Sequence, residues 1–182
     1  MKKLLLFVCT LFLIQTLTAQ EAQEKTIRPF FTGSFKLTFA VNENFTLDPD
    51  DDETFLKLTG TFFRFGVGYQ FGKRFSLSLN AGYDHHFPYA INAFPTYVTA
   101  RYNLWGDIEG SFFTQFSRGK MWRPSSRYED GDYYNFGVGW QLYADSRWKP
   151  VIKLLYHRKN IRGFEDSGTL ESVSLGIGFR FL

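Results

Sequence analysis

The sequence predicts an all-β protein: an eight-stranded antiparallel transmembrane β-barrel with the up-and-down topology of a meander. Its final segment, residues 173–182, has large apolar residues at odd positions and small or charged residues at even positions as far as Arg180. This alternation is typical of a strand with one apolar and one polar face. Aromatic residues form 20% of the chain, yet no segment after the N-terminal run approaches the roughly 18 consecutive apolar residues of a spanning helix. A chain of this composition is expected to place its apolar residues on alternating strand positions.

Residues 1–19 have the layout of a secretory signal peptide. Two lysines precede an apolar run over residues 4–14, and Ala19 supplies a small residue at the expected cleavage point. We therefore expect export by the Sec route and a mature barrel domain of residues 20–182. Cys9, the only cysteine, lies in the signal peptide, so the mature chain has no thiol for a disulfide, a metal site or a nucleophile. Subtracting the two lysines from 21 basic residues leaves 19 against 18 acidic ones, a balance that gives no argument for a nucleic-acid partner.

Four segments in the first part of the mature chain show the two-residue alternation of a strand. They span about residues 31–41, 61–71, 75–85 and 97–104. In the first, for example, Phe35 and Leu37 lie on one face and Lys36 on the other. The segment from Gly72 to Arg74 is short and polar, which predicts a tight turn between the second and third strands. Each strand is expected to place its apolar face toward lipid and its polar face toward the barrel lumen.

The second part of the chain continues the pattern with four more segments. They span about residues 108–117, 133–143, 148–158 and 173–182. The seventh strand is the least regular, because Val151 and Leu155 fall on the same face as Lys153 and His157. The last strand places Arg180 between two phenylalanines, so its charge is expected to point into a polar lumen.

The connections between these segments alternate in length. Those after the first, third, fifth and seventh strands are long, at about residues 42–60, 86–96, 118–132 and 159–169, whereas the other three are short. An even strand count with both termini on the short-turn side is typical of a bacterial outer-membrane barrel, with short periplasmic turns and long external loops. The alternative architecture is a soluble eight-stranded calyx of the lipocalin kind, which would turn the apolar face inward. An eight-stranded barrel is too narrow to enclose so many large apolar side chains, which favours the membrane barrel.

The polar face carries charged residues that are expected to meet inside the lumen. The basic ones are Lys36, Arg64, Arg101, Lys153 and Arg180, and the acidic ones are Asp84 and Glu109. Arg or Lys on the lipid face near the middle of a bilayer costs about 2–4 kcal/mol, so these residues are expected to point inward. We predict a structural plug of ion pairs and hydrogen bonds. The excess of basic groups leaves open a second possibility, a narrow channel that prefers anions or other small solutes.

Neither a metal nor a cofactor is expected. The acidic segment at residues 48–53 lacks the glycine and glutamate spacing of an EF-hand loop, which favours a solvated external loop. His85 and His86 are adjacent on a strand, so their rings point to opposite faces and cannot bind one ion together. They are expected to form a pair at the barrel rim.

The last hairpin resembles the outer-membrane lipid A deacylases, eight-stranded barrels that use a Ser-His-Glu triad. His157, Asn160 and Glu171 fall on positions that match the family's His-x-Ser-Asn motif and its downstream Glu. Lys159 stands where the family has its serine nucleophile. A protonated lysine cannot take over acyl transfer beside a histidine base without a large pKa shift, so an enzyme is not expected.

The alternative is therefore a lipid A-modifying acyl hydrolase that uses His157 and Glu171. Its nucleophile would have to be another residue, such as Ser167 or Ser172. The two-residue alternation places His157 on the lumen side and Glu171 on the lipid side, near the ends of their strands.

The whole mature chain resembles the small outer-membrane barrels of the OmpA-like and OmpX-like kind. The resemblance rests on the signal peptide, the eight alternating segments, the alternating connections and an aromatic-rich end in which Phe181 is the penultimate residue. It implies the outer membrane of a Gram-negative bacterium, lipopolysaccharide and other outer-membrane lipids as neighbours, and the barrel-assembly machinery and periplasmic chaperones as partners during biogenesis. We expect a non-enzymatic integral protein whose external loops serve envelope or surface interaction. The third loop mixes aromatic and basic groups that could meet lipopolysaccharide phosphates or a partner surface; its residues include Met121, Trp122, Arg123, Pro124, Arg127 and Tyr128.

Overall fold

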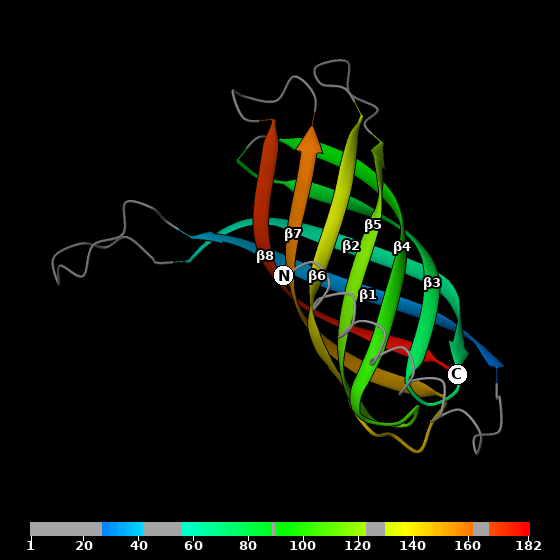
Figure 1. Ribbon diagram of the computed structural model, residues 1–182. Coiled ribbons are helices and arrows are strands. Elements are labelled where there is room, and N and C mark those ends of the chain that lie inside the picture. Colours follow the sequence, from blue (N-terminus) through cyan, green and yellow to red (C-terminus); the bar gives the residue numbers. More distant parts are fainter. Residues whose placement is uncertain (1–26, 42–55, 89, 123–129, 162–167) are drawn as a thin grey trace, which may run out of the picture.

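The computed structural model describes residues 27–41, 56–88, 90–122, 130–161 and 168–182. Eight strands form one closed antiparallel barrel in which each strand pairs with its neighbours in sequence and β1 pairs with β8 (Figure 1). The strands are β1 (Ile27–Val41), β2 (Leu56–Phe71), β3 (Phe75–His86), β4 (Ile91–Gly106), β5 (Ser111–Trp122), β6 (Gly131–Gln141), β7 (Trp148–Ile161) and β8 (Thr169–Phe181). The predicted fold class is confirmed. None of the described residues form a helix with the length and apolarity required to cross a membrane.

The first and last strands close the barrel, and the start of β1 and the end of β8 lie at the same end of it. Ile27 at the start of β1 lies opposite Phe71, while Phe181 at the end of β8 lies between Phe31 and Trp148. The three short connections, at residues 72–74, 107–110 and 142–147, lie at this same end, which we call the turn end. The other connections join the strands at the opposite end, which we call the loop end (Figure 1).

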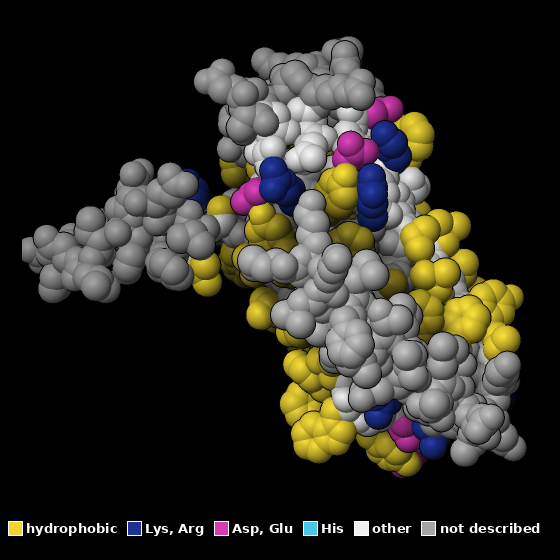
Figure 2. All heavy atoms as spheres, viewed as in Figure 1, with side chains coloured by type: hydrophobic (Ala, Val, Ile, Leu, Met, Phe, Trp, Pro, Cys, Tyr) yellow, Lys and Arg dark blue, Asp and Glu magenta, His cyan; other side chains and the backbone are white. Residues whose placement is uncertain are grey.

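The barrel is apolar outside and largely polar inside. On β8, Leu175 and Ile177 are 52% and 64% exposed, whereas Ser174 and Arg180 on the other face of the strand are buried. Large apolar side chains on every strand are exposed in the same way, and Figure 2 shows them around the lower flanks of the barrel. Most of the buried side chains are polar or charged. This arrangement is the reverse of a soluble calyx, whose apolar face would line the interior.

Several large rings also lie inside the barrel, which the sequence analysis did not anticipate. Phe62, Phe113 and Tyr133 are fully buried. Glycines on the inner face leave room for such rings. A Cβ atom at Gly68 would lie 2.7 Å from the Phe30 ring. The lumen is therefore filled partly by aromatic rings and partly by polar groups.

The connection between β3 and β4 is much shorter than predicted. Residues 86–96 were expected to form a loop, but β4 already begins at Ile91, and only residues 87–90 connect the strands. Pro95 lies inside β4 although proline lacks the N–H that a strand interior needs. In the structure, pairing of β4 with β3 is interrupted between Ala93 and Thr96, while Pro95 stays paired with Met121 of β5. The strand thus accommodates the proline by losing ladder contacts on one side only.

The fifth strand is shifted toward the loop end relative to the predicted 108–117. It begins at Ser111 and extends to Trp122, because residues 107–110 form a turn. The Asp107 carboxylate accepts hydrogen bonds from the backbone N–H groups of Glu109 (2.9 Å) and Gly110 (3.3 Å), a local arrangement that favours turns. Consequently Met121, predicted to lie in an external loop, is a buried strand residue, and Trp122 is an exposed one. Residues 123–129 of that loop, the acidic segment 48–53 and the predicted signal peptide at residues 1–19 lie outside the described residues.

Candidate functional site

The barrel interior contains two groups of charged side chains. The first, which we call the Asp84 cluster, lies toward the loop end and consists of Arg64, Asp84, His86 and Lys159 with the hydrogen-bonded His157 beside them. The second, which we call the basic chamber, surrounds a cavity nearer the turn end. It contains Lys36, Arg101, Lys153 and Arg180, and Arg64 also lines its cavity.

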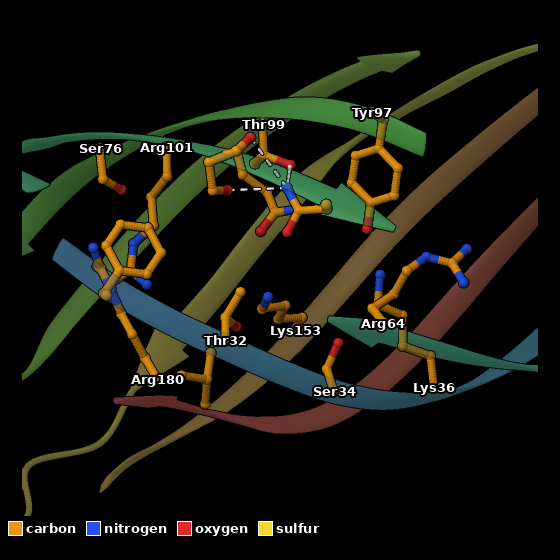
Figure 3. A pocket seen from close by; sticks show the side chains of 15 residues that line it. Thr32, Ser34, Lys36, Arg64, Ser76, Tyr97, Thr99, Arg101, Lys153 and Arg180 are labelled. Atoms are coloured by element: carbon orange, nitrogen blue, oxygen red, sulfur yellow. Dashed lines mark hydrogen bonds between the residues drawn. The ribbon is translucent and has the colours of Figure 1, made fainter. Parts of the chain in front are cut away.

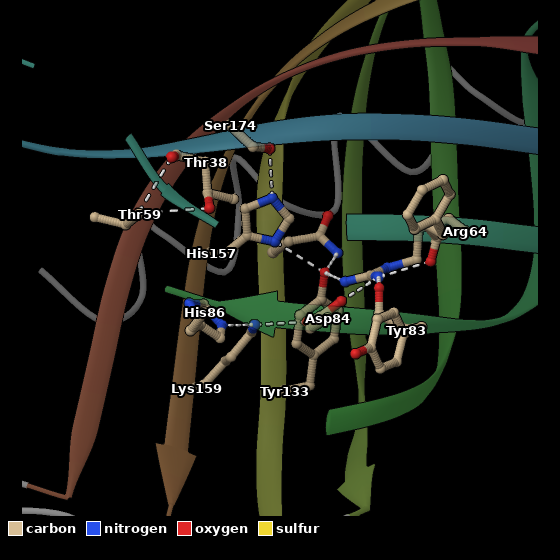
Figure 4. A network of polar contacts seen from close by, with 12 residues as sticks. Thr38, Thr59, Arg64, Tyr83, Asp84, His86, Tyr133, His157, Lys159 and Ser174 are labelled. Atoms are coloured by element: carbon tan, nitrogen blue, oxygen red, sulfur yellow. Dashed lines mark hydrogen bonds and ion pairs between the residues drawn. The ribbon is translucent and has the colours of Figure 1, made fainter. Parts of the chain in front are cut away.

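In the Asp84 cluster, one buried carboxylate pairs with two cations from different strands. Arg64 of β2 forms an ion pair with Asp84 Oδ1, and Lys159 Nζ of β7 lies 2.5 Å from Oδ2. Lys159 also donates a hydrogen bond to His86 Nε2 at 2.6 Å. Asp84, His86 and Lys159 are at most 2% exposed. Such buried charges are tolerated when each is paired and hydrogen-bonded, and both carboxylate oxygens here face a cation (Figure 4).

His157 joins this cluster through hydrogen bonds on both sides of its ring. Its Nδ1 lies 2.8 Å from the Tyr133 hydroxyl, and its Nε2 lies 2.6 Å from Ser174 Oγ. The Tyr133 oxygen already accepts from Asn135 Nδ2 (3.1 Å) and Arg64 Nη2 (3.5 Å). Its own proton is therefore directed to Nδ1. The histidine proton then sits on Nε2 and is donated to Ser174, so this ring cannot act as a base toward that serine.

The residues of the suggested triad are not brought together. His157 is fully buried in the lumen, whereas the Glu171 side chain on the outer face is 50% exposed and lies 3.7 Å from Arg158. Lys159, which stands at the position of the missing serine, is occupied by Asp84 and His86. Ser172 faces His157 in the strand register, and Ser167 lies outside the described residues. The Ser174 contact was not anticipated, although the strand alternation already places it on the lumen side.

The basic chamber surrounds a cavity of about 40 Å³ in the middle of the barrel (Figure 3). Its cationic lining residues are Lys36, Arg64, Arg101, Lys153 and Arg180. Hydroxyl and amide side chains complete the polar lining, and no acidic residue is among the described residues that line it. The sequence-predicted basic residues therefore do converge on one space.

The two arginines of the chamber are held by aromatic rings and neutral polar groups. Arg101 lies over the Phe113 ring at 3.6 Å and Arg180 over the Phe30 ring at 3.7 Å, as in cation–π contacts. Arg101 donates to three side-chain oxygens at 2.8–3.1 Å, those of Asn103, Ser111 and Gln141. Arg180 Nη2 donates to Gln70 Oε1 at 2.7 Å.

Glu109 does not belong to the lumen, which corrects its predicted role as a counter-charge there. It lies in the turn at residues 107–110, where its side chain is 44% exposed and forms an ion pair with Lys149. Lys149 Nζ also donates to the carbonyl oxygen of Ala144 at 2.6 Å. Lys149 was not predicted to be a lumen residue, although it lies on the same face of β7 as Lys153 and His157. This pair closes the rim at the turn end.

The two adjacent histidines point to opposite faces, as predicted. His85 is on the outer face, where its Nδ1 lies 2.7 Å from Asn92 Oδ1. His86 is not a rim residue, because it is buried inside the Asp84 cluster. In the described part of the chain, no three His, Cys, Asp or Glu residues are grouped so that they could hold a metal ion.

Comparison with solved structures supports the fold. The crystal structure of Neisserial surface protein A (NspA) matches with a TM-score of 0.59 and 10% sequence identity, over 86% of this chain and 99% of that chain. A de novo designed transmembrane β-barrel matches with a TM-score of 0.46 and 9% identity, again over 86% of this chain and 99% of that chain. No protein-family model and no curated protein sequence matches the chain. The likeness to NspA shows the fold of a small membrane barrel.

Proposed function

We propose that the protein is an integral outer-membrane protein of a Gram-negative bacterium, with a plugged lumen and no enzymatic activity. The observation that carries this proposal is the polarity of the barrel. Exposed Phe65, Leu79 and Ile177 are each more than 60% accessible on the outside, while charged residues fill the inside. In water this large apolar surface would remain exposed at a high cost in free energy, whereas in a membrane the acyl chains of the lipids cover it favourably.

The outer surface near the loop end fits lipopolysaccharide as the neighbouring lipid. Arg118, Lys120 and Arg158 are exposed on β5 and β7 toward that end. Figure 2 shows basic and acidic side chains mixed there, above the exposed apolar side chains. Basic groups at this height can bind lipid phosphates through charge-assisted hydrogen bonds. The external loops beyond them serve envelope or surface interaction in this proposal.

A non-enzymatic role is supported by the surroundings of His157. Its two ring nitrogens are occupied by Tyr133 and Ser174, and it has no exposed surface for a lipid substrate. Glu171, the partner that a triad would require, lies on the opposite face and close to Arg158. An acyl hydrolase would need both groups and a serine on one accessible surface.

Mass spectrometry of lipid A from cells that overexpress the protein tests this proposal. We expect unchanged lipid A, together with recovery of the protein in the outer-membrane fraction. A matched His157→Ala strain serves as the control. Loss of one acyl chain in the wild-type strain only would overturn the non-enzymatic role, and recovery in the soluble fraction would overturn the location.

A narrow channel is the second candidate, because cations line the interior cavity. Planar-bilayer recordings distinguish it from a plug. We expect no appreciable conductance, since Arg101 is tied to Gln141 and Arg180 to Gln70 across the turn end of the lumen. Stable anion-selective openings, increased by Arg101→Ala, would favour the channel instead.

Biogenesis supplies a further part of the proposal. The final strand ends on Phe179, Arg180 and Phe181, with the two aromatic residues on the outer face beside Trp148. We assign this end to recognition by the barrel-assembly machinery after delivery by periplasmic chaperones. Phe181→Ser is expected to lower the amount of assembled barrel in the outer membrane, as measured by heat-modifiable mobility on gels. Unchanged assembly would count against this role.

A further inference from the structure

The basic chamber has an excess of positive charge that the described residues do not neutralise. Asp84 is engaged by Arg64 and Lys159, and Glu109 by Lys149 outside the chamber. No ion pair involves Lys36, Arg101, Lys153 or Arg180 among the residues that the structure describes. Burial of a charge without a partner is strongly unfavourable, so a bound anion would stabilise the chamber whenever these groups are protonated.

The cations are near enough to repel one another. Lys153 interacts unfavourably with Arg101, Arg180 and Arg64. Lys36 interacts unfavourably with Arg64, Lys153 and Lys159 and favourably only with Asp84, which is already paired with Arg64 and Lys159. Lys36 and Arg180 are each 2% exposed, which limits the water available to screen them. Their mutual repulsion adds to the cost of burying each one separately.

Donor groups in the chamber are left without acceptors. Arg180 uses Nη2 to reach Gln70, but its buried Nε and Nη1 atoms have no hydrogen-bond partner within the described chain. Figure 3 shows Lys153 extending into the space between Arg180 and Lys36. Buried donors of this kind are normally satisfied, so they point to an acceptor that is not part of the protein.

The glutamines at the turn end cannot supply the missing negative charge. Gln70 Nε2 donates to the backbone oxygens of Gly72 (2.9 Å) and Phe75 (3.0 Å), and Gln141 Nε2 donates to that of Ile108 (2.6 Å). These bonds direct the amide oxygens of both glutamines toward the arginines. Each oxygen is a neutral acceptor, so the chamber is closed at this end while its net charge stays positive.

We propose that the basic chamber is a binding site for a small inorganic anion of the chloride class, held by Lys153 and Arg180 inside the barrel, with Lys36 lining the same cavity. The cavity of about 40 Å³ gives room for one small anion with a little water. A lipid headgroup is too large for it. The anion compensates the buried cations and accepts hydrogen bonds from the unpartnered Arg180 donors. It is a resident structural ligand, which goes beyond the plugged lumen of the proposed function.

Chloride-dependent stability provides the first test. The mature full chain is refolded in detergent, and urea unfolding is followed in sodium chloride and in sodium gluconate at equal ionic strength. We expect a higher unfolding midpoint in chloride, with a difference that saturates as chloride is raised. The double variant Lys36→Met/Lys153→Met should lose this difference, whereas Lys120→Met, a change on the exposed outer surface, should keep it.

Two outcomes overturn the proposal in that experiment. If the wild-type barrel has equal unfolding midpoints in both salts, no bound chloride stabilises the fold. A chloride effect that persists in the double variant means that chloride acts elsewhere on the molecule. Either result is independent of the membrane location and of enzymatic activity.

Crystals of the wild-type barrel grown in bromide provide a test that does not depend on a variant folding. We expect an anomalous scattering peak in the chamber, within hydrogen-bond distance of Lys153 Nζ or the Arg180 guanidinium. Crystals of the same form grown without bromide are the control. A chamber that shows only water under saturating bromide overturns the proposal.

Discussion

The Asp84 cluster and the basic chamber lie in the same lumen but balance charge in different ways. In the cluster, Asp84 meets Arg64 and Lys159, and every charged group has a charged partner within about 4 Å. In the chamber, Arg101 and Arg180 meet only neutral oxygens and aromatic rings. A plug can thus be closed by ion pairs at one level and remain electrostatically incomplete at another. The cluster should therefore stabilise the fold by itself, and the chamber should do so only with a bound anion.

Loss of the cluster's carboxylate should have the largest effect. Asp84→Asn leaves Arg64 and Lys159 buried without their counter-charge, and breaking a buried pair in this way costs about 3–5 kcal/mol. Urea unfolding in detergent or lipid vesicles measures the change. Asp132→Asn is the matched control, because Asp132 pairs with Lys120 on the surface at 3.2 Å and such pairs contribute about 0–1 kcal/mol. Equal effects of the two variants would show that the cluster is not the stabilising element.

A charge on the outer face should cost slightly less. Ile177→Arg places a guanidinium on the exposed apolar face of β8, where Ile177 is 64% exposed. We expect a loss of about 2–4 kcal/mol in lipid if this position lies near the bilayer middle. Tyr143→Arg, just beyond β6 at the turn end, is the control and should cost about 0–1 kcal/mol. The topology is wrong if a lipid-soluble quencher reaches labels at Gly176 and not at Ile177.

The faces of the strands could be predicted, because a barrel in lipid separates side chains by a strict two-residue period. Arg64, Arg101 and Arg180 were assigned to the lumen from this period and from the cost of a charge on the lipid face, and the structure buries all three. The ends of the strands were harder to predict. Residues 86–96 were expected to form a loop, but β4 begins at Ile91 and contains Pro95. Glu109 was expected in a strand because it fits the two-residue alternation, but it lies in the turn before β5.

The partners inside the lumen could not be predicted. Lys159 and Asp84 are 75 residues apart in sequence, and they meet only because β7 and β3 face each other across the closed barrel. The two-residue alternation predicts which face of the strand a residue occupies. It does not predict the position of that residue along the barrel axis, which depends on the register of every strand pair around the barrel. For that reason Lys159 was noted as a departure from a catalytic motif, whereas its contacts are those of a cation in an ion-pair cluster.

Removing a cation from the chamber should change the stability of the fold in the opposite direction and increase it. Lys153→Met takes away a positive charge that has no acidic partner among the described residues, and the replacement has a similar length. We expect stabilisation by about 1 kcal/mol in chloride-free buffer, the lower end of the gain seen when buried charges are replaced by apolar groups. The matched change Lys159→Met in the cluster should destabilise instead, because Asp84 then loses a partner. Destabilisation by both changes would remove the distinction between the two regions.

The smallest predicted change in stability comes from a comparison of two serines that lie near the same histidine. Ser174 Oγ accepts a hydrogen bond from His157 Nε2 at 2.6 Å, whereas Ser172 pairs with His157 only through the strand register. Ser174→Ala should cost about 1 kcal/mol, the typical contribution of one hydrogen bond. Ser172→Ala should cost less, because it removes no side-chain hydrogen bond to His157. Urea unfolding gives the energies, and nitrogen NMR of the His157 ring should show the Nε2–H tautomer in the wild type and a perturbed Nε2 signal in Ser174→Ala alone. A wild-type ring protonated at Nδ1 instead would mean that the Tyr133 hydroxyl accepts from His157, and Ser174 would then be the donor to Nε2. That arrangement would restore the serine–histidine geometry of a nucleophile and its base, so the same spectrum that measures a single hydrogen bond also bears on whether this interior could support acyl transfer.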